Sequence, residues 1–238
     1  MLDFRIYEFL ASIFTPELNI SSSLKIANLV MDLMGEYVGG EPSILPVPQD
    51  APPGIPRIIF SSSDKKWTLN ISLERTNIFY DTPPTSTEKV ITIDEFSSIV
   101  SAFFGDYQKG LDLRVQRIAF VTERLAIRDD AIDYVLGRFC NEKQIAKGRP
   151  FFDTKRFEIH SLKTYDWENF RINSWVRTKF LPIKIGDGET APGILVVSDL
   201  NTLSLDEAPE AAFLADDIKT YFEKIPQHLN KILKLYFD

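Results

Sequence analysis

The chain has 238 residues, of which 44% are hydrophobic and 12% aromatic, enough to bury a sizeable core. Its formal net charge of −7 argues against nucleic-acid binding over the whole surface, and a single cysteine excludes a disulfide within the chain. The N-terminal segment carries charges inside its apolar run, and no apolar run approaches the roughly 18 residues of a membrane span, so we expect a cytoplasmic protein.

The first segments alternate between strand and helix signals. Residues 2–14 predict a strand, and a serine cap at residues 22–23 opens a helical pattern that stops at Gly39 and Gly40. Residues 41–56 contain six prolines and predict an extended surface connection.

A hairpin and a second helix complete the first half. Residues 57–74 alternate as two strands around a polar turn, and residues 77–81 predict a further short strand. Thr92 and Glu95 form a capping-box signature before an apolar helical stripe that ends at Gly110.

The second half repeats this order. Residues 111–127 have the period-two pattern of a long central strand, and Asp129 or Asp130 caps a helical pattern that stops near Gly148. Residues 153–164 and 169–183 predict two long strands.

The last segments are a strand and a helix. A turn at residues 186–188 leads to a predicted strand at 193–198. The C-terminal helix is expected to begin near Ser204 and Glu207 and to kink at Pro226.

The predicted fold class is therefore α+β, with two β-α-β-β-β-α halves, residues 1–110 and 111–238, in one compact domain. We expect one mainly antiparallel sheet with helices on one face. This order of elements is similar to the saddle of the TATA-binding-protein fold at the level of topology.

No catalytic motif stands out, and no cofactor is expected. The sequence has no G-x-S-x-G elbow and no glycine-rich phosphate loop. Cys140, His160 and His228 fit structural roles, because none has a partner at metal-ligand spacing. A metal-dependent nuclease built on Asp153 and Glu158, with Lys155 and Lys163 nearby, is one alternative.

Residues 111–184 hold 15 Lys and Arg against 10 Asp and Glu, so the middle third is locally basic. Aromatic residues are interleaved with these cations, which is typical of faces that stack bases or hold phosphates. The other interpretation is that the charges solvate the outer face of a sheet. The candidate nucleic-acid-binding residues are Arg114, Arg124, Lys163, Arg171 and Arg177.

Three segments resemble a sporadically distributed family of bacterial proteins of about this length that has no assigned activity. They are PRIIFSSSDKKWTLNISLERTNIFYD (residues 56–81), RIAFVTERLAI (117–127) and DLNTLSLDE with the helix after it (199–237). The chain departs from the family pattern at Ala119, where the family has glycine, and at residues 121–123. The resemblance implies no catalytic residue, and the family's patchy distribution is compatible with mobile or defence-associated genes.

The functional expectation is a non-enzymatic interaction protein that binds a protein partner or another copy of itself. The sheet or the proline-rich connection would provide the surface. A nucleic-acid or nucleotide-binding component that uses the basic strands is the first alternative, and the metal-dependent nuclease is the second. No membrane partner is expected.

Overall fold

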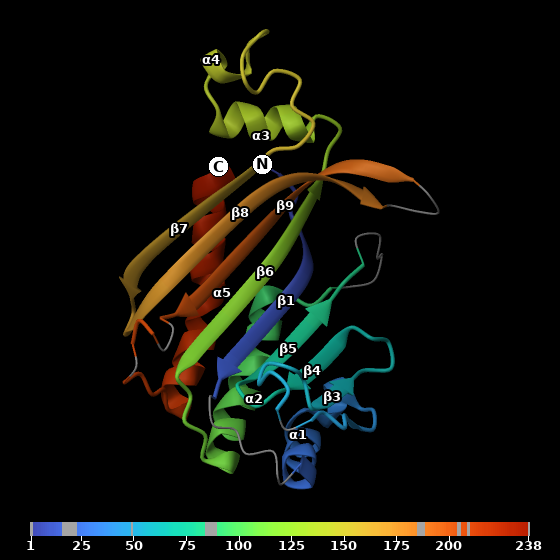
Figure 1. Ribbon diagram of the computed structural model, residues 1–238, viewed down its shortest axis with the longest axis vertical. Coiled ribbons are helices and arrows are strands. Elements are labelled where there is room, and N and C mark those ends of the chain that lie inside the picture. Colours follow the sequence, from blue (N-terminus) through green and yellow to red (C-terminus); the bar gives the residue numbers. More distant parts are fainter. Residues whose placement is uncertain are drawn as a thin grey trace.

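The computed structural model describes residues 2–15, 23–48, 50–83, 90–184, 189–203, 206–208 and 210–237. In these residues nine strands form one antiparallel sheet, in the order β2-β3-β4-β5-β1-β6-β9-β8-β7 (Figure 1). The strands are β1 (Arg5–Phe14), β2 (Ser43–Ile44), β3 (Ile58–Ser61), β4 (Trp67–Ile71), β5 (Arg75–Asp81), β6 (Arg117–Ile127), β7 (Glu158–Trp167), β8 (Phe170–Lys184) and β9 (Thr190–Thr202). The helices are α1 (Ser23–Val38), α2 (Ile93–Leu111), α3 (Ala131–Phe139), α4 (Glu142–Ile145) and α5 (Ala215–Phe237).

The opening strands of the two halves, β1 and β6, lie side by side at the centre of the sheet. The closing strand of each half pairs with its own opening strand, β5 with β1 and β9 with β6. The predicted α+β class, with two halves in one antiparallel sheet, is therefore confirmed. The internal repeat, which was inferred from the order of the elements, stays a prediction.

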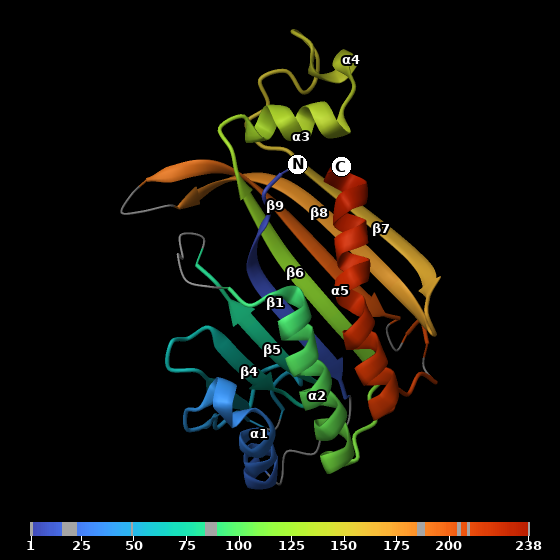
Figure 2. The same cartoon turned by 180° about the vertical axis from the view of Figure 1, so that it is seen from behind.

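Helices α1, α2 and α5 pack on one face of the sheet, while α3 and α4 lie beyond one end of it (Figures 1 and 2). Aromatic rings join the two layers: the Phe9 ring on β1 stacks on Phe96 of α2 with centroids 4.8 Å apart, and Phe96 meets Phe120 of β6 at 5.6 Å. Phe222 of α5 extends the series, with its centroid 6.1 Å from that of Phe120. All four side chains are fully buried. The opposite face of the sheet carries no helix in the described residues, and we call it the open face.

Serines allow α2 to pack closely against α5. Pro226 lies inside α5 and has no backbone N–H, so the carbonyl of Phe222 lacks its usual helical donor. The hydroxyl of Ser97 on α2 donates a hydrogen bond to that carbonyl, and the Ser101 hydroxyl donates to the Lys219 carbonyl at 3.3 Å. The helix that was expected to kink at Pro226 runs continuously from Ala215 to Phe237.

The capping box predicted for α2 is confirmed. The Thr92 hydroxyl accepts from the Glu95 backbone N–H at 3.1 Å, and the Glu95 carboxylate accepts from the Thr92 backbone N–H at 2.7 Å. Asp112 adopts the left-handed conformation that ends the helix, with φ 51°.

Two predicted boundaries in the second half were wrong. The strand expected at residues 111–127 begins only at Arg117, because α2 extends to Leu111 and its cap occupies the next residue. The single helix expected over residues 129–148 is two helices, because Cys140 is extended, with φ −119° and ψ 153°, and interrupts the helical hydrogen bonds. Asp130 makes no side-chain cap.

Later boundaries also moved. β7 begins at Glu158 instead of residue 153, because Asp153 has the left-handed φ of 53° and lies in a turn. α5 begins at Ala215, because Phe213 forms a β-bridge with Val115 and its N–H donates to the Val115 carbonyl at 2.7 Å. Ser22, Ser204 and the turn at residues 186–188 lie outside the described residues.

Candidate functional site

The open face is apolar in its central strands, where a solvated sheet face is normally polar. Ile118 and Phe120 of β6 face the helices, so the alternate residues Val121 and Leu125 face the open side. On this side Leu125 packs with Ile183, Leu195 and Val197 in a second, smaller buried cluster. Central strands that are apolar on both faces are typical of sheets that are covered on both sides.

One line of apolar side chains crosses the open face from β5 to β7, and we call it the apolar row. The strand register places its members directly opposite one another, with Asp199 of β9 between the third and the fourth. The members are Phe79, Leu10, Val121, Trp175 and Leu162. Four of them are partly exposed, and Leu162 is 50% exposed. Six strands at a spacing of about 4.8 Å give the row a length of roughly 24 Å.

Polar contacts flank the apolar row. The Asp199 carboxylate accepts from the Asn201 amide at 2.9 Å, and the Asn201 side-chain oxygen accepts from the Arg117 guanidinium at 2.7 Å. The Arg117 guanidinium also lies 4.9 Å from the centroid of the Phe14 ring. Arg177 lies 5.3 Å from the Trp175 ring, so this face carries two cation–π pairs.

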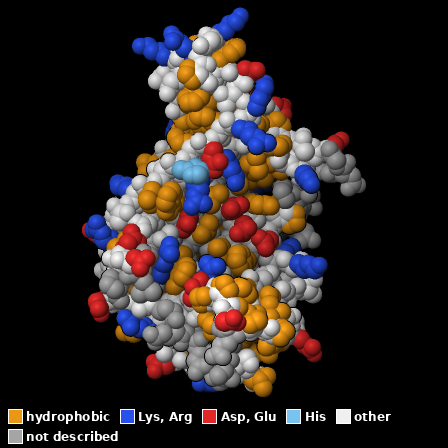
Figure 3. Space-filling model, in the orientation of Figure 1, with side chains coloured by type: hydrophobic (Ala, Val, Ile, Leu, Met, Phe, Trp, Pro, Cys, Tyr) orange, Lys and Arg blue, Asp and Glu red, His pale blue; other side chains and the backbone are white. Residues whose placement is uncertain are grey.

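Three carboxylates lie beside the apolar row, two residues along the same strands, and we call them the acidic row. Glu8 on β1 pairs in register with Asp81 on β5 and with Glu123 on β6. The register of β1 shifts between Ile6 and Glu8, and the bulge turns Tyr7 toward the open-face cluster. Figure 3 shows acidic side chains at the centre of this face with hydrophobic side chains around them.

The acidic row holds protons more tightly than free carboxylates do. Burial raises the pKa of Glu8 to about 7, with further contributions from the neighbouring charges of Glu123 and Asp81. Burial also raises the pKa of Asp81 and that of Glu123, and the nearby Lys179 opposes the rise for Glu123. Glu8 is therefore close to half-protonated near neutral pH, and a cation placed at this row would be stabilised by three carboxylates.

The five candidate nucleic-acid-binding residues do not share one face. Arg171 and Arg177 are on the open face, where Arg171 pairs with Asp166 at 3.0 Å. Lys163 faces the helix side, with its ammonium 5.3 Å from the Tyr165 ring. The remaining two are Arg114, an exposed residue before β6, and Arg124, which is buried.

Arg124 is only 3% exposed and faces the helix layer. Its guanidinium donates to the Asn230 side-chain oxygen of α5 at 2.8 Å, and its Nη1 has no hydrogen-bond partner among the described residues. Burial lowers the pKa of Arg124 to about 10. This arginine therefore serves packing between β6 and α5.

The histidines make local contacts. His160 contacts the Glu158 carboxylate at 2.6 Å, and His228 contacts the Tyr165 hydroxyl at 2.6 Å. The His228 ring also stacks on Trp167, with centroids 5.0 Å apart, and burial lowers the pKa of its imidazole.

The residues of the nuclease alternative are also in local contacts. Asp153 lies in a turn outside β7 and pairs with Lys155 at 2.5 Å, while Glu158 pairs with His160. Within the described ranges, no group of three His, Cys, Asp or Glu side chains is arranged to hold a metal ion.

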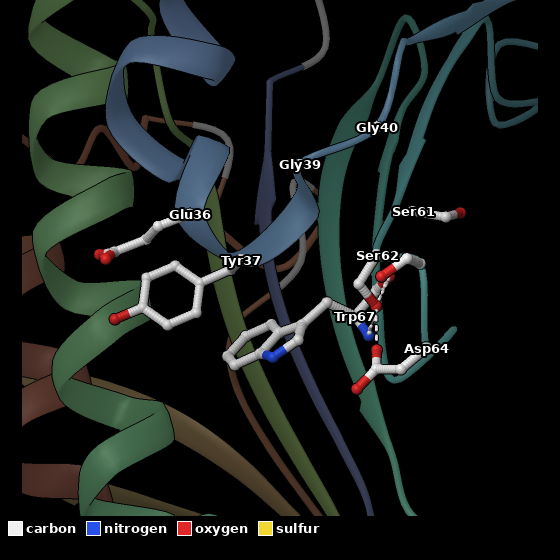
Figure 4. Close-up of a pocket in the computed structure, with 9 residues that line it drawn as sticks. Glu36, Tyr37, Gly39, Gly40, Ser61, Ser62, Asp64 and Trp67 are labelled. Atoms are coloured by element: carbon white, nitrogen blue, oxygen red, sulfur yellow. Dashed lines mark hydrogen bonds between the residues drawn. The ribbon is translucent and has the colours of Figure 1, made fainter.

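A hollow of about 380 Å³ lies between the end of α1 and the β3–β4 hairpin (Figure 4). Tyr37 and Trp67 form its aromatic side, with ring centroids 5.0 Å apart. The Ser62 hydroxyl accepts from the Trp67 backbone N–H at 2.9 Å and donates to the Asp64 carboxylate at 2.6 Å, and this bond lowers the pKa of Asp64. These bonds close the hairpin turn and engage the Ser62 hydroxyl and the Asp64 carboxylate with each other.

The acidic row was missed in the sequence. Its signal was a carboxylate in the middle of each apolar opening strand, Glu8 in β1 and Glu123 in β6. Asp81 offered no signal, because a carboxylate at the end of a strand is common.

No described helix is long and apolar enough to cross a membrane. No protein-family model matches the chain, and no curated protein matches it. The resemblance of three segments to a bacterial family therefore stays a prediction.

Proposed function

We propose that this protein is a non-enzymatic interaction protein that binds a protein partner on the open face of its sheet. One observation carries the proposal: the apolar row reaches across the sheet from β5 to β7, interrupted only by Asp199 on β9, and its side chains are partly exposed, with Leu162 50% exposed. A contiguous apolar surface rimmed by polar groups is typical of a binding site in a protein that stays in solution. Aromatic and arginine side chains, which are enriched at interfaces, occur together here as Trp175 with Arg177 and Phe14 with Arg117.

The two rows define the chemistry of the partner. Apolar side chains of the partner would contact the apolar row, and Lys or Arg side chains would contact the acidic row beside it. An amphipathic helix has this pattern, and about 16 residues at 1.5 Å per residue would span the roughly 24 Å of the apolar row. A nucleic-acid backbone would meet three carboxylates at the centre of the face, so charge complementarity favours a basic protein segment.

A peptide titration tests the proposal. The probe is a 16-residue helical peptide with leucines on one face and lysines beside them, and the signal is tryptophan fluorescence. Trp175 is the tryptophan on the open face, while Trp67 and Trp167 face the helices, so Trp175→Phe assigns the signal. We expect the lysine peptide to bind and the same peptide with glutamates in place of lysines to bind at least about tenfold more weakly, a difference of 1.4 kcal/mol.

Two variants locate the binding site. Phe79→Glu, at the end of the apolar row, is expected to weaken binding of the lysine peptide by about tenfold or more. Leu235→Glu is the matched control, because Leu235 is 80% exposed on α5, on the other side of the sheet. Equal affinity for the lysine and glutamate peptides would contradict the proposal. Tight binding of a DNA oligonucleotide would also contradict it, if Phe79→Glu abolishes that binding.

A further inference from the structure

The two edges of the sheet differ in how they are protected. β2 at one edge has two residues, and the chain after it contains Pro46 and Pro48. β7 at the other edge has ten residues without a proline, and it pairs with β8 along its whole length without a register shift. Natural sheets usually protect a long edge with prolines, bulges, charged side chains or a covering element, because unpaired backbone groups attract another strand. β7 has charged side chains but no proline and no bulge. In the part of the chain that the structure describes, no strand pairs with the outer side of β7.

The backbone groups that β7 leaves unpaired can be identified. The Phe180 N–H donates to the carbonyl of Phe157, the residue opposite it in the register of β7 and β8, at 3.2 Å. In an antiparallel pair of strands, opposite residues that exchange hydrogen bonds alternate with opposite residues that do not. Because Phe157 belongs to a hydrogen-bonded pair, the odd-numbered residues of β7 direct their backbone N–H and C=O groups toward β8. The even-numbered residues point theirs outward, and all five of them are exposed: Glu158, His160, Leu162, Thr164 and Asp166.

Four of these side chains make contacts within β7 or with β8. Asp166 pairs with Arg171 at 3.0 Å, the Thr164 hydroxyl bonds to the Asn173 side chain at 2.5 Å, and Glu158 contacts His160. The centre of the strand is Leu162, whose apolar side chain is 50% exposed. The outer edge of β7 therefore has unpaired backbone N–H and C=O groups along its length and an apolar residue at its midpoint.

From this edge we infer that β7 pairs antiparallel with β7 of a second copy of the chain, about a two-fold axis at Leu162. Antiparallel pairing centred on Leu162 places it opposite its own copy, His160 opposite Thr164, and Glu158 opposite Asp166. The backbone groups of all these residues point away from β8, so they can form hydrogen bonds with the second copy along the whole strand. Their side chains lie on the same side of the sheet, so the open face of one copy continues into the open face of the other. The pairing forms about ten backbone hydrogen bonds and buries both Leu162 side chains.

The dimer has a consequence for the open face. A two-fold axis perpendicular to the sheet keeps both open faces on the same side. Leu162 is the last member of the apolar row, so the rows of the two copies meet at the axis and form one continuous row. The pairing itself rests on the β7 backbone and does not require the proposed function.

Mass measurements over a range of concentrations test the pairing. We expect size-exclusion chromatography with light scattering to give twice the chain mass of 27.2 kDa at high concentration. Leu162→Pro removes an outward N–H and leaves the bonds between β7 and β8 in place, so it should give a folded monomer, with an unchanged circular dichroism spectrum. Leu162→Val keeps the N–H and an apolar side chain and should remain a dimer. A wild-type monomer at every concentration, or a Leu162→Pro dimer as stable as the wild type, would overturn the inference.

A disulfide test in the Cys140→Ser background checks the register and does not depend on the proline variant. Leu162→Cys places two thiols across the axis at Cα atoms about 5.5 Å apart, within the range for a disulfide, and should form a covalent dimer on oxidation. Thr164→Cys is the matched control, because residue 164 lies opposite residue 160 of the other copy and should not crosslink to itself. A covalent dimer from Thr164→Cys but none from Leu162→Cys would overturn the pairing about Leu162.

Discussion

Replacing Glu8 with glutamine should stabilise the protein at alkaline pH and leave its stability nearly unchanged at acid pH. In the folded state the pKa of Glu8 is raised from 4.5 to about 7, mainly by burial and next by the charges of Glu123 and Asp81. The folded state therefore binds this proton more tightly than the unfolded state does. Its contribution is fully present below pH 4.5 and is lost as the pH rises through about 7.

The size of the effect follows from this difference in pKa. At about 1.4 kcal/mol per pH unit, the rise from 4.5 to about 7 sets an upper limit of about 3.5 kcal/mol. Because Glu8 is only half-buried, solvent screening reduces this to roughly 1–2 kcal/mol. Glu8→Gln has no charge to desolvate, so its free energy of unfolding should exceed that of the wild type by this amount at pH 8.

Urea unfolding of the wild type and Glu8→Gln between pH 5 and pH 8 measures the difference. Glu158→Gln is the matched control on the same face, because its bond with His160 lowers the pKa of Glu158 and its removal should give no gain at high pH. If the advantage of Glu8→Gln does not grow with pH, burial beside two carboxylates does not control this proton, and the reasoning is refuted.

Three further predictions concern the contacts and the cap of the helices. Ser97→Ala should lower the free energy of unfolding by about 1–3 kcal/mol, because the Phe222 carbonyl next to the α5 proline loses its donor, whereas Ser97→Thr should retain most of it. Asn230→Ala should lower the free energy of unfolding by about 1.5–3 kcal/mol, because it leaves the buried Arg124 without its hydrogen-bond partner. In the Arg124→Met background the same Asn230→Ala change should cost much less, because no buried guanidinium remains. Thr92→Ala should cost about 0.5–2 kcal/mol through loss of the α2 cap. Thermal and urea unfolding measure all three, and additive effects of Asn230→Ala and Arg124→Met would contradict their coupling.

Local chemistry in the sequence predicted the elements whose ends are set by neighbouring residues. The capping box at Thr92 and Glu95 located the start of α2, and period-two alternation located the β3–β4 hairpin. The start of α5 was misplaced, because the bridge between Phe213 and Val115 joins residues far apart in the chain and has no local signal.

The positions of the basic residues in the middle third also could not be predicted from local sequence. Alternation along one strand does not say which face the helices cover, so Arg124 and Arg177 looked equivalent in the sequence. In the fold Arg124 is buried under α5, and Arg177 stands on the open face above Trp175. The role of the five candidates in nucleic-acid binding stays a prediction.

The sequence by itself determined the α+β class and most of the elements in the two halves, but it missed the short strand β2 and the break between α3 and α4. What it determined follows from periodicity and from residues that are close along the chain. Only the tertiary structure decided which strands are neighbours, and therefore that Glu8 meets Asp81 and Glu123, and that one apolar row crosses the sheet to Leu162. The physical reason is that strand register joins residues that are distant in the chain, and a side chain gains its burial, its neighbouring charges and its pKa only from that pairing.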